Sequence, residues 1–195
     1  MNKKHNKEDI LRVGIDLMRT TGYHNVGVQE VIKTCSIPKG SFYNFFESKE
    51  KFAVQAIQLY SSDILEFWTQ IEQSQELNGE QKVHAAFKVL FNEYQEGNYQ
   101  RTCLLGNLSL ETCSSSKALG RQIEQSWTEW KEVLRLMIQQ AREEGSFSNR
   151  MSSSAITNFL FDTFYGILNR IKVERSSLPV KQFFSVYIPM VQAQA

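Results

Sequence analysis

Proline is absent from most of this chain. The 195 residues hold three prolines, Pro38, Pro179 and Pro189, so the long segment between the first two contains none. Proline removes a backbone donor and clashes with the preceding helical turn, so its absence leaves room for long helices. Apolar residues recur in this segment at helical spacing, and no segment shows the alternation of a half-buried strand. The sequence therefore predicts an all-α fold.

Helix-terminating residues divide the chain into about nine expected helices. Gly22 and Gly145 supply C-terminal stops, and Ser48 and the serines at 152–154 supply N-caps. A break is expected at 97–101. The expected helices cover residues 7–21, 28–34, 39–45, 48–73, 83–94, 101–113, 117–144, 152–175 and 179–192.

Bulk composition excludes several classes of protein. Hydrophobic residues make up 42% of the chain, which is enough for a buried core. No stretch of about 18 uninterrupted apolar residues occurs, so we predict no membrane span. The polar start lacks the apolar core of a signal peptide, which favours a cytoplasmic protein. The three cysteines form no CxxC pair, and with the three scattered histidines they show no metal-ligand spacing, so we expect no metal and no cofactor.

The net charge of +1 hides an asymmetry along the chain. Residues 1–51 hold nine Lys or Arg against six Asp or Glu, and the remainder holds thirteen against fifteen. Positive charge therefore concentrates in the N-terminal quarter. This distribution favours binding to the phosphates of a nucleic acid at that end of the chain.

The segment from Val28 to Lys49 carries the most specific pattern. Two short amphipathic helices joined by a tight turn at 36–38 are typical of a helix-turn-helix. The alternative is that such a pair serves only as a packing unit. The apolar side chains expected in the core of the motif are Val31, Ile32, Ile37, Phe42, Phe45 and Phe46.

The second helix of this motif is predicted to lie against DNA. Its free backbone N–H groups and positive dipole end favour a phosphate, and Gly40 lets the backbone approach closely. Lys39, Ser41 and Asn44 are candidates for reading base edges. The predicted DNA-binding residues are Gln29, Lys39, Gly40, Ser41, Tyr43, Asn44 and Lys49, of which Tyr43 and Lys49 are expected to contact phosphate.

The run from Ile37 to Phe52, IPKGSFYNFFESKEKF, resembles the TetR family of bacterial repressors. Gly22-Tyr23 and residues 28–32 share the resemblance, which covers about residues 7–52, while the remaining helices agree with the family in number and length only. The resemblance implies a nine-helix homodimer. It also implies a C-terminal domain that binds an effector and changes the separation of the two DNA-reading heads.

These expectations define a function. The chain is predicted to be a DNA-binding transcriptional regulator, a repressor released from a palindromic double-stranded operator by a small-molecule or reactive-electrophile effector. Residues 1–50 would form the helix-turn-helix domain, and residues 51–195 the effector-binding and dimerisation domain. The rival classes are an all-helical protein-interaction module and an enzyme. No Gly-rich phosphate loop, paired-carboxylate motif or nucleophile elbow occurs, so we predict no catalytic residue and no enzyme.

Four positions depart from the family pattern. Val26 and Gly27 stand where the family commonly has Thr followed by Ser or Thr, so a hydroxyl contact to phosphate and a side-chain N-cap would be missing. Ser36 replaces the glycine of the turn, so either Ser36 adopts an unusual backbone conformation or the turn differs. Ile32 replaces a small Ala.

The last two expected helices are apolar over more than one face. A helix with this distribution is buried on two sides, of which one can serve its own domain and the other a partner. We therefore expect a twofold four-helix interface between two copies. The alternative is a thick monomer core.

Aromatic residues on the middle helices, together with one cysteine, are the candidates for an effector pocket. Effector pockets are usually apolar with few polar anchors, although a stripe at helical spacing also suits an ordinary core. The candidate lining residues are Phe67, Trp68, Phe91, Tyr94, Cys103, Trp127, Trp130, Phe161 and Tyr165.

Cys103 lies in the segment 102–111, TCLLGNLSLE, which resembles a motif of one TetR branch. That branch includes repressors that sense electrophiles or oxidants through a cysteine here, and also members that bind small molecules reversibly. Arg101 lies next to this segment and would favour the thiolate. The alternative is a buried, inert cysteine. Cys35 and Cys113 are weaker candidates, and Cys35 is expected to pack the helix-turn-helix.

Overall fold

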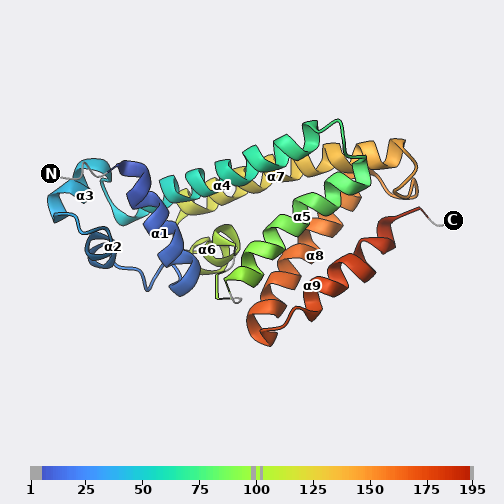
Figure 1. The fold of residues 1–195 in the computed structure, drawn as a ribbon. Coiled ribbons are helices and arrows are strands. Elements are labelled where there is room, and N and C mark those ends of the chain that lie inside the picture. Colours follow the sequence, from blue (N-terminus) through green and yellow to red (C-terminus); the bar gives the residue numbers. More distant parts are fainter. Residues whose placement is uncertain (1–5, 98–99, 102, 194–195) are drawn as a thin grey trace. The chain divides into compact units, whose positions relative to one another are not determined.

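The computed structural model describes residues 6–97, 100–101 and 103–193. Within these residues the predicted all-α fold is confirmed: nine α-helices follow one another as Figure 1 shows, and the β-structure is a single bridge between Phe147 and Gln192. The helices are α1 (Lys7–Thr21), α2 (Val28–Cys35), α3 (Lys39–Phe45), α4 (Lys49–Gln73), α5 (Gly79–Glu96), α6 (Leu104–Thr112), α7 (Lys117–Glu143), α8 (Ser153–Glu174) and α9 (Leu178–Gln182).

Local caps set the helix boundaries close to their expected positions. The backbone N–H of Lys51 donates to Oγ of Ser48 at 3.1 Å, and that of Ala155 donates to Oγ of Ser152 at the same distance. Gly145 follows α7 with a φ of 80°, a left-handed conformation that glycine adopts without a steric penalty. Of the predicted break at 97–101, residues 98–99 lie outside the described residues, as does Thr102.

The expectation of one regular helix over 179–192 is wrong. α9 ends at Gln182 and continues as a π-helical turn, Phe183–Tyr187, in which the N–H of Ile188 donates to the carbonyl of Phe183 at 3.0 Å. A 3₁₀ turn, Pro189–Val191, then ends the segment. Pro189 has no N–H with which to continue a helical ladder, and the π-helical turn ends just before it.

The chain forms two compact units. The first unit consists of Met1–Asp63 and Arg101–Ser126, and the second of Ile64–Gln100 and Trp127–Ala195. The predicted division into domains at residues 50 and 51 stays a prediction.

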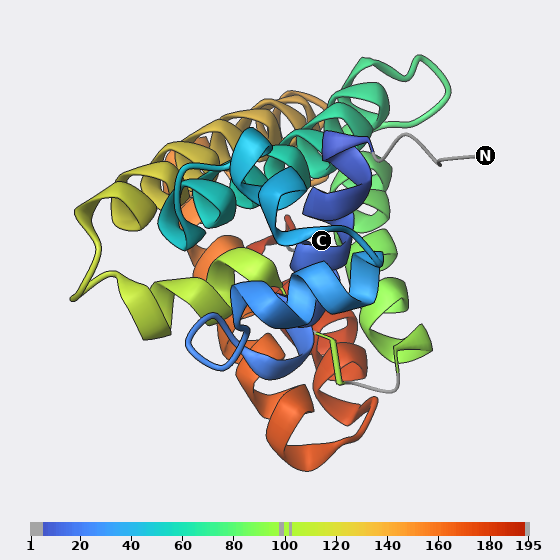
Figure 2. The same cartoon turned by 90° about the vertical axis from the view of Figure 1, so that its left-hand side faces the viewer.

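A cluster of three phenylalanines forms the core of the helix-turn-helix. The rings of Phe42, Phe46 and Phe52 have centroids between 4.9 and 5.2 Å apart, and all three side chains are buried. Gly14 lets α1 pack closely against this cluster, because a Cβ there would lie 2.1 Å from the Phe52 ring. Helices α1, α3 and α4 therefore meet at a small aromatic core, and α1 and α3 are drawn in shades of blue in Figure 2.

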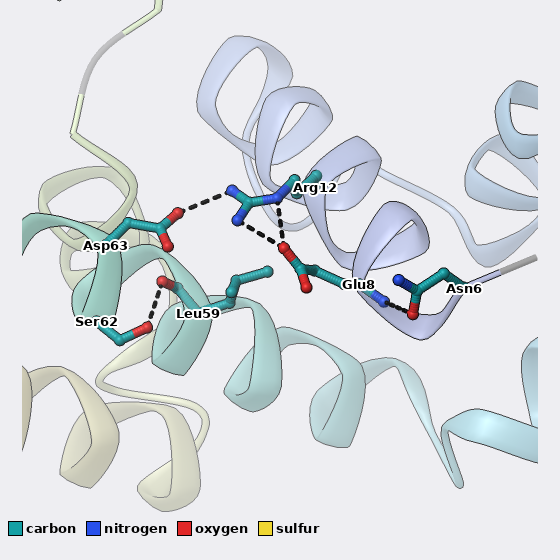
Figure 3. A network of polar contacts seen from close by, with 6 residues as sticks. All are labelled: Asn6, Glu8, Arg12, Leu59, Ser62 and Asp63. Carbon is teal, nitrogen blue, oxygen red and sulfur yellow. Dashed lines mark hydrogen bonds and ion pairs between the residues drawn. The ribbon is translucent and has the colours of Figure 1, made fainter.

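An ion-pair network joins α1 to α4 in the same unit. Figure 3 shows Arg12 between two carboxylates, with its guanidinium 2.7 Å from Glu8 and 2.8 Å from Asp63. Asn6 caps α1 by accepting a hydrogen bond from the N–H of Glu8 at 3.2 Å. About half of each charged side chain is exposed, so each pair stabilises the unit by only about 0.2–1 kcal/mol.

The second unit has a larger aromatic core. Phe87 and Phe91 of α5, Phe164 of α8 and Phe183 of the π-helical turn have neighbouring ring centroids 4.7 to 5.6 Å apart. Gly79 begins α5 where a Cβ would lie 2.2 Å from the backbone nitrogen of Ala141. The first turn of α5 therefore touches the backbone of α7.

Across the described ranges, we find no helix that combines the length and the apolar character needed to span a bilayer. His, Cys, Asp and Glu side chains in the same ranges form no group of three or more that is suited to a metal ion.

Candidate DNA interface

The turn between α2 and α3 fixes the direction of α3, which the sequence predicts to be the recognition helix. Ser36 adopts a left-handed backbone conformation, with φ 55° and ψ 42°, and the N–H of Ile37 donates to the carbonyl of Ile32 at 3.1 Å. Ile37 is buried, as predicted. Ser36 therefore adopts the conformation that a turn glycine supplies more easily, and the helix-turn-helix geometry is kept.

One face of α3 is open and polar. Lys39, Gly40, Tyr43 and Asn44 are exposed, while Phe42 on the opposite face is fully buried. The ammonium group of Lys39 lies 5.9 Å from the ring centroid of Tyr43, and a Cβ at Gly40 would meet no atom within 4 Å. The open face therefore presents an ammonium, a phenol and an amide, groups that suit contacts to phosphates and base edges.

Two positions on α3 differ from expectation. Phe45 was expected in the core but is 39% exposed, and Ser41 was expected on the outer surface but is half-buried. Phe42 and Phe46, four residues apart, share the buried face. Ser41 and Phe45 are also four residues apart, and they occupy the flank between the core and the open face.

The N-terminus of α2 lacks a side-chain cap. Gly27 occupies the cap position with no side-chain hydrogen bond, and Val26 is buried with 2% exposure. As the sequence indicates, no side-chain hydroxyl at residues 26 and 27 caps α2 or faces outward to contact a phosphate. Gln29 lies exposed in the first turn, the position from which a side chain can reach DNA.

Lys49 is held at the start of α4 against the loop that follows α1. Its ammonium group lies 4.3 Å from the ring centroid of Tyr23 and 3.5 Å from the carbonyl oxygen of His24. Burial lowers the pKa of Lys49, and the charge of Glu111 opposes that change. Burial also raises the pKa of the Tyr23 phenol.

Glu111 of α6 contacts the same loop. The backbone N–H of His24 donates to Oε2 of Glu111 at 3.2 Å, and Nε2 of His24 lies 3.1 Å from the carbonyl oxygen of Glu111. Sequence reasoning did not assign a role to Tyr23, His24 or Glu111. Gly22-Tyr23 was part of the family resemblance, but no spacing signal joins His24 to a residue 87 positions later.

The predicted effector residues fall in both units. Cys103 belongs to the first unit, and the eight aromatic residues belong to the second. In the second unit the indole N–H of Trp68 donates to the carbonyl of Ala86 at 3.2 Å, and that of Trp127 donates to the hydroxyl of Tyr165 at 2.6 Å. The buried members are Trp68, Phe91, Tyr94, Trp130 and Phe161, and the half-buried members are Phe67, Trp127 and Tyr165. Their effector role stays a prediction.

The second unit also has two surface hollows. The larger, about 660 Å³, is lined by residues of the α7–α8 loop and the C-terminal segment, and the smaller, about 240 Å³, by polar residues of α7 and α8. Neither lining includes a predicted effector residue.

Cys103 is buried at the N-terminus of α6, with 1% exposure. The guanidinium of Arg101 lies 3.6 Å from the carboxylate of Asp16 and forms an ion pair with it. Cys113 is exposed, and Cys35 is partly buried in the helix-turn-helix, where burial raises its thiol pKa.

Two parts of the chain match known protein families. Residues 10–56 match the model for bacterial regulatory proteins of the tetR family, and residues 79–187 match the tetracyclin repressor-like C-terminal domain. The second match alone covers more than half of the chain. The chain belongs to the TetR family.

Relatives of this TetR-family chain include proteins named as repressors. It is 27% identical to the HTH-type transcriptional repressor DhaR of Mycobacterium sp. (strain GP1), over 92% of the chain and 89% of the relative. It is 26% identical to the HTH-type transcriptional repressor NemR of Escherichia coli (strain K12), over 90% and 88%. A regulatory TetR protein from Rhodobacter sphaeroides shares the fold, with a TM-score of 0.89 and 22% identity over 94% of this chain and 97% of that one.

Membership of the TetR family settles the class of function. The chain is a DNA-binding transcriptional repressor, and TetR regulators bind DNA operators and form dimers. The prediction that it is not an enzyme is confirmed by the family and by the named relatives. The packing-unit and interaction-module alternatives are therefore rejected.

Proposed function

We propose that two copies of this TetR-family chain bind a palindromic operator and that an effector releases them from it. The observation that carries this proposal is the open polar face of α3 beside a buried phenylalanine core. A recognition helix exposed in this way fits the major groove, and a twofold dimer matches a palindrome. Action on genomic DNA implies a cytoplasmic protein.

The contacts divide into two groups by chemistry. Lys39, Ser41 and Asn44 would read base edges, since an ammonium, a hydroxyl and an amide can each hydrogen-bond in the groove. Tyr43 and Lys49 would contact phosphates and set the register. Gln29, from α2, and the backbone at Gly40 complete the proposed interface.

A row of positions along α8 supports the proposed dimer. Ala155, Phe159, Asp162, Gly166 and Val173 follow spacings of four, three, four and seven residues, the pattern of a helix–helix seam. None of these five residues is buried within the chain, and Val173 is 83% exposed. A Cβ at Gly166 would meet no atom within 4 Å, so this part of the row is open to a second helix.

Two routes of release remain within the proposal. A small molecule would bind among the predicted aromatic residues of the second unit, whose side chains already form an apolar environment. An electrophile would instead react with Cys103, as the resemblance to the electrophile-sensing branch implies. In that step the thiolate adds to an activated C=C bond, a C–S bond forms, and the resulting carbanion takes a proton from water. Since Cys103 is 1% exposed, this route requires local opening of α6.

Operator binding is tested by selecting bound fragments from a bacterial genomic library and measuring affinity for the enriched site. Lys39→Ala and Asn44→Ala are expected to weaken discrimination between the site and its single-base variants, by about 1–3 kcal/mol at the base each residue reads. Val89→Ala, at an exposed position of α5, is the control. Unchanged discrimination in both variants would contradict the proposed interface.

Release is tested on the same operator complex. N-ethylmaleimide should dissociate the wild-type complex and spare Cys103→Ser if the electrophile route operates, while Cys113→Ser serves as the exposed-thiol control. Equal release of wild type and Cys103→Ser rejects this route. Release by a non-reactive compound would support the reversible route.

A further inference from the structure

Two side chains from distant parts of the sequence hold the loop between α1 and α2, which we call the α1–α2 loop (residues 22–27). Lys49 approaches it from the start of α4, and Glu111 approaches it from α6. Both contacts fall within the first unit, so they connect the DNA-binding helices to α6 inside one compact body.

The Lys49 side chain contacts this loop. Its ammonium lies over the ring of Tyr23 at 4.3 Å and near the carbonyl oxygen of His24 at 3.5 Å, and the residue is half-buried. An ammonium held by an aromatic face and a carbonyl keeps a fixed direction while it retains donors for a phosphate. The shape of the loop therefore determines where Lys49 presents its charge.

Glu111 determines the shape of that loop. Its carboxylate accepts the N–H of His24 at 3.2 Å, a charge-assisted hydrogen bond. The carboxylate also lies against Gly22, where a Cβ would be 2.5 Å from Oε1 and where φ is +86°. The close approach and the positive φ both require glycine at this position.

α6 itself is fixed to the DNA-binding helices. The side-chain amide of Asn107 donates to the carbonyl oxygen of Arg19 in α1 at 3.1 Å. Beyond α6, the hydroxyl of Ser116 donates to the carboxylate of Glu50, the residue after Lys49. α6 and the connection that follows it therefore contact both the end of α1, just before the α1–α2 loop, and the first turn of α4 beside Lys49.

We infer that Glu111 is a positioning residue for operator binding: it holds the α1–α2 loop so that Lys49 faces a DNA phosphate. This inference rests on the proposed phosphate contact of Lys49. It also gives α6 a defined connection to DNA affinity, because withdrawal of the Glu111 carboxylate frees the N–H of His24 and removes the negative charge that attracts Lys49.

The test compares Glu111→Ala, Glu111→Gln and Lys49→Ala in the full chain, with Leu110→Ala, at a 78% exposed position of α6, as the matched control. Affinity for the selected operator is measured across a salt series. Lys49→Ala removes one phosphate contact from each half-site, so the slope of log K against log salt should become shallower by about 2 for the dimer. Near 0.1 M salt the affinity should fall by roughly 10- to 100-fold.

Glu111→Ala should reproduce much of both changes, and Glu111→Gln should stay within about threefold of wild type because its amide oxygen still accepts the N–H of His24. In the Lys49→Ala background, Glu111→Ala should have little further effect, since both act through one contact. Circular dichroism checks that each variant is folded.

The outcomes separate the two proposals. If Lys49→Ala weakens binding and flattens the slope while Glu111→Ala leaves both unchanged, the phosphate contact stands and the positioning role of Glu111 is overturned. Additive effects in the double variant also overturn it. Tighter binding by both Glu111 variants would mean that Glu111 only repels DNA. If Lys49→Ala leaves operator affinity and the salt slope unchanged, the proposed phosphate contact itself is overturned.

Discussion

The two units use aromatic side chains in opposite ways. In the first unit, three buried phenylalanines hold helices whose other faces stay open, and Tyr43 is 47% exposed. In the second unit, aromatic rings from α5, α8 and the π-helical turn pack on one another and are largely buried. The comparison teaches that the proposed DNA-binding groups lie on an open helix face over a small core, whereas most of the aromatic residues proposed for the effector are buried core residues.

Removal of one ring from each core should give the largest effects. Phe42→Ala and Phe87→Ala each delete a side chain with 0% exposure, and each should lower the free energy of unfolding by about 3–5 kcal/mol. Phe42→Ala should also abolish operator binding, because the Phe42 ring of α3 packs on Phe46 and Phe52 and so holds the helix in place. Denaturant unfolding and fluorescence anisotropy with operator DNA measure the two effects.

The comparison breaks if Phe42→Ala keeps operator affinity. It would then follow that the cluster of three phenylalanines does not hold α3 in place. The small core of the first unit would then tolerate a cavity without loss of DNA binding.

Two glycine substitutions should differ in their effect on stability, and this difference should be the second largest effect. Gly79→Ala places a Cβ 2.2 Å from the backbone of Ala141 and should cost about 1–3 kcal/mol of stability. Gly120→Ala, in the part of α7 that belongs to the first unit, meets its nearest atom at 3.8 Å and should be neutral or stabilise by up to about 1 kcal/mol. Thermal unfolding of both variants checks this difference, and equal melting temperatures would refute the close approach of α5 and α7.

Tyr43→Phe should have a smaller and more selective effect. The variant keeps the exposed ring but loses the hydroxyl that is proposed to donate to a phosphate, so operator affinity should fall by about 0.5–1.5 kcal/mol. The salt slope should not change, because no charge is removed. Anisotropy titrations at several salt concentrations test both statements, and a shallower slope would assign Tyr43 a different role.

The smallest effect should be a dependence of stability on pH that arises from His84 in the second unit. Burial lowers the pKa of His84, which stacks on Phe184 with ring centroids 5.5 Å apart, while Glu80 opposes the change. The unfolded chain therefore binds the proton first as pH falls. The stability contribution of His84 is complete above its unfolded pKa of about 6.5 and is lost as pH falls below that value. Unfolding of wild type and His84→Gln at pH 8 and pH 5.5 should show a larger loss for wild type, and equal losses would contradict this reasoning.

The sequence predicted most of the fold because its signals are local. The serine caps, the glycine stops and the apolar periodicity gave helix boundaries within a few residues, apart from α5, which starts at Gly79 rather than near residue 83. The apolar spacing of 180–191 suits an α-helix, but the chain forms a π-helical turn over 183–187 and a 3₁₀ turn that begins at Pro189, which lacks the N–H of a regular ladder.

The candidate interface was predictable for a similar reason. Lys39, Tyr43 and Asn44 follow from the pattern of one short helix, and the structure leaves them exposed. The contact between His24 and Glu111 was not predictable, because it depends on how α6 packs against a loop far away in the sequence. Phe45 was misjudged because an apolar side chain beside two buried ones was assumed to share their face.

Binding of the full chain to the selected operator and to a scrambled duplex of equal length tests the central claim most directly. Anisotropy titrations between about 50 and 200 mM salt should show a steep, linear fall of log K with log salt on the operator, and saturation at two chains per site. The operator should bind at least about 10³-fold more tightly than the scrambled duplex. Equal affinity for the two duplexes, or saturation at one chain per operator, would contradict a dimer that reads a palindrome through α3.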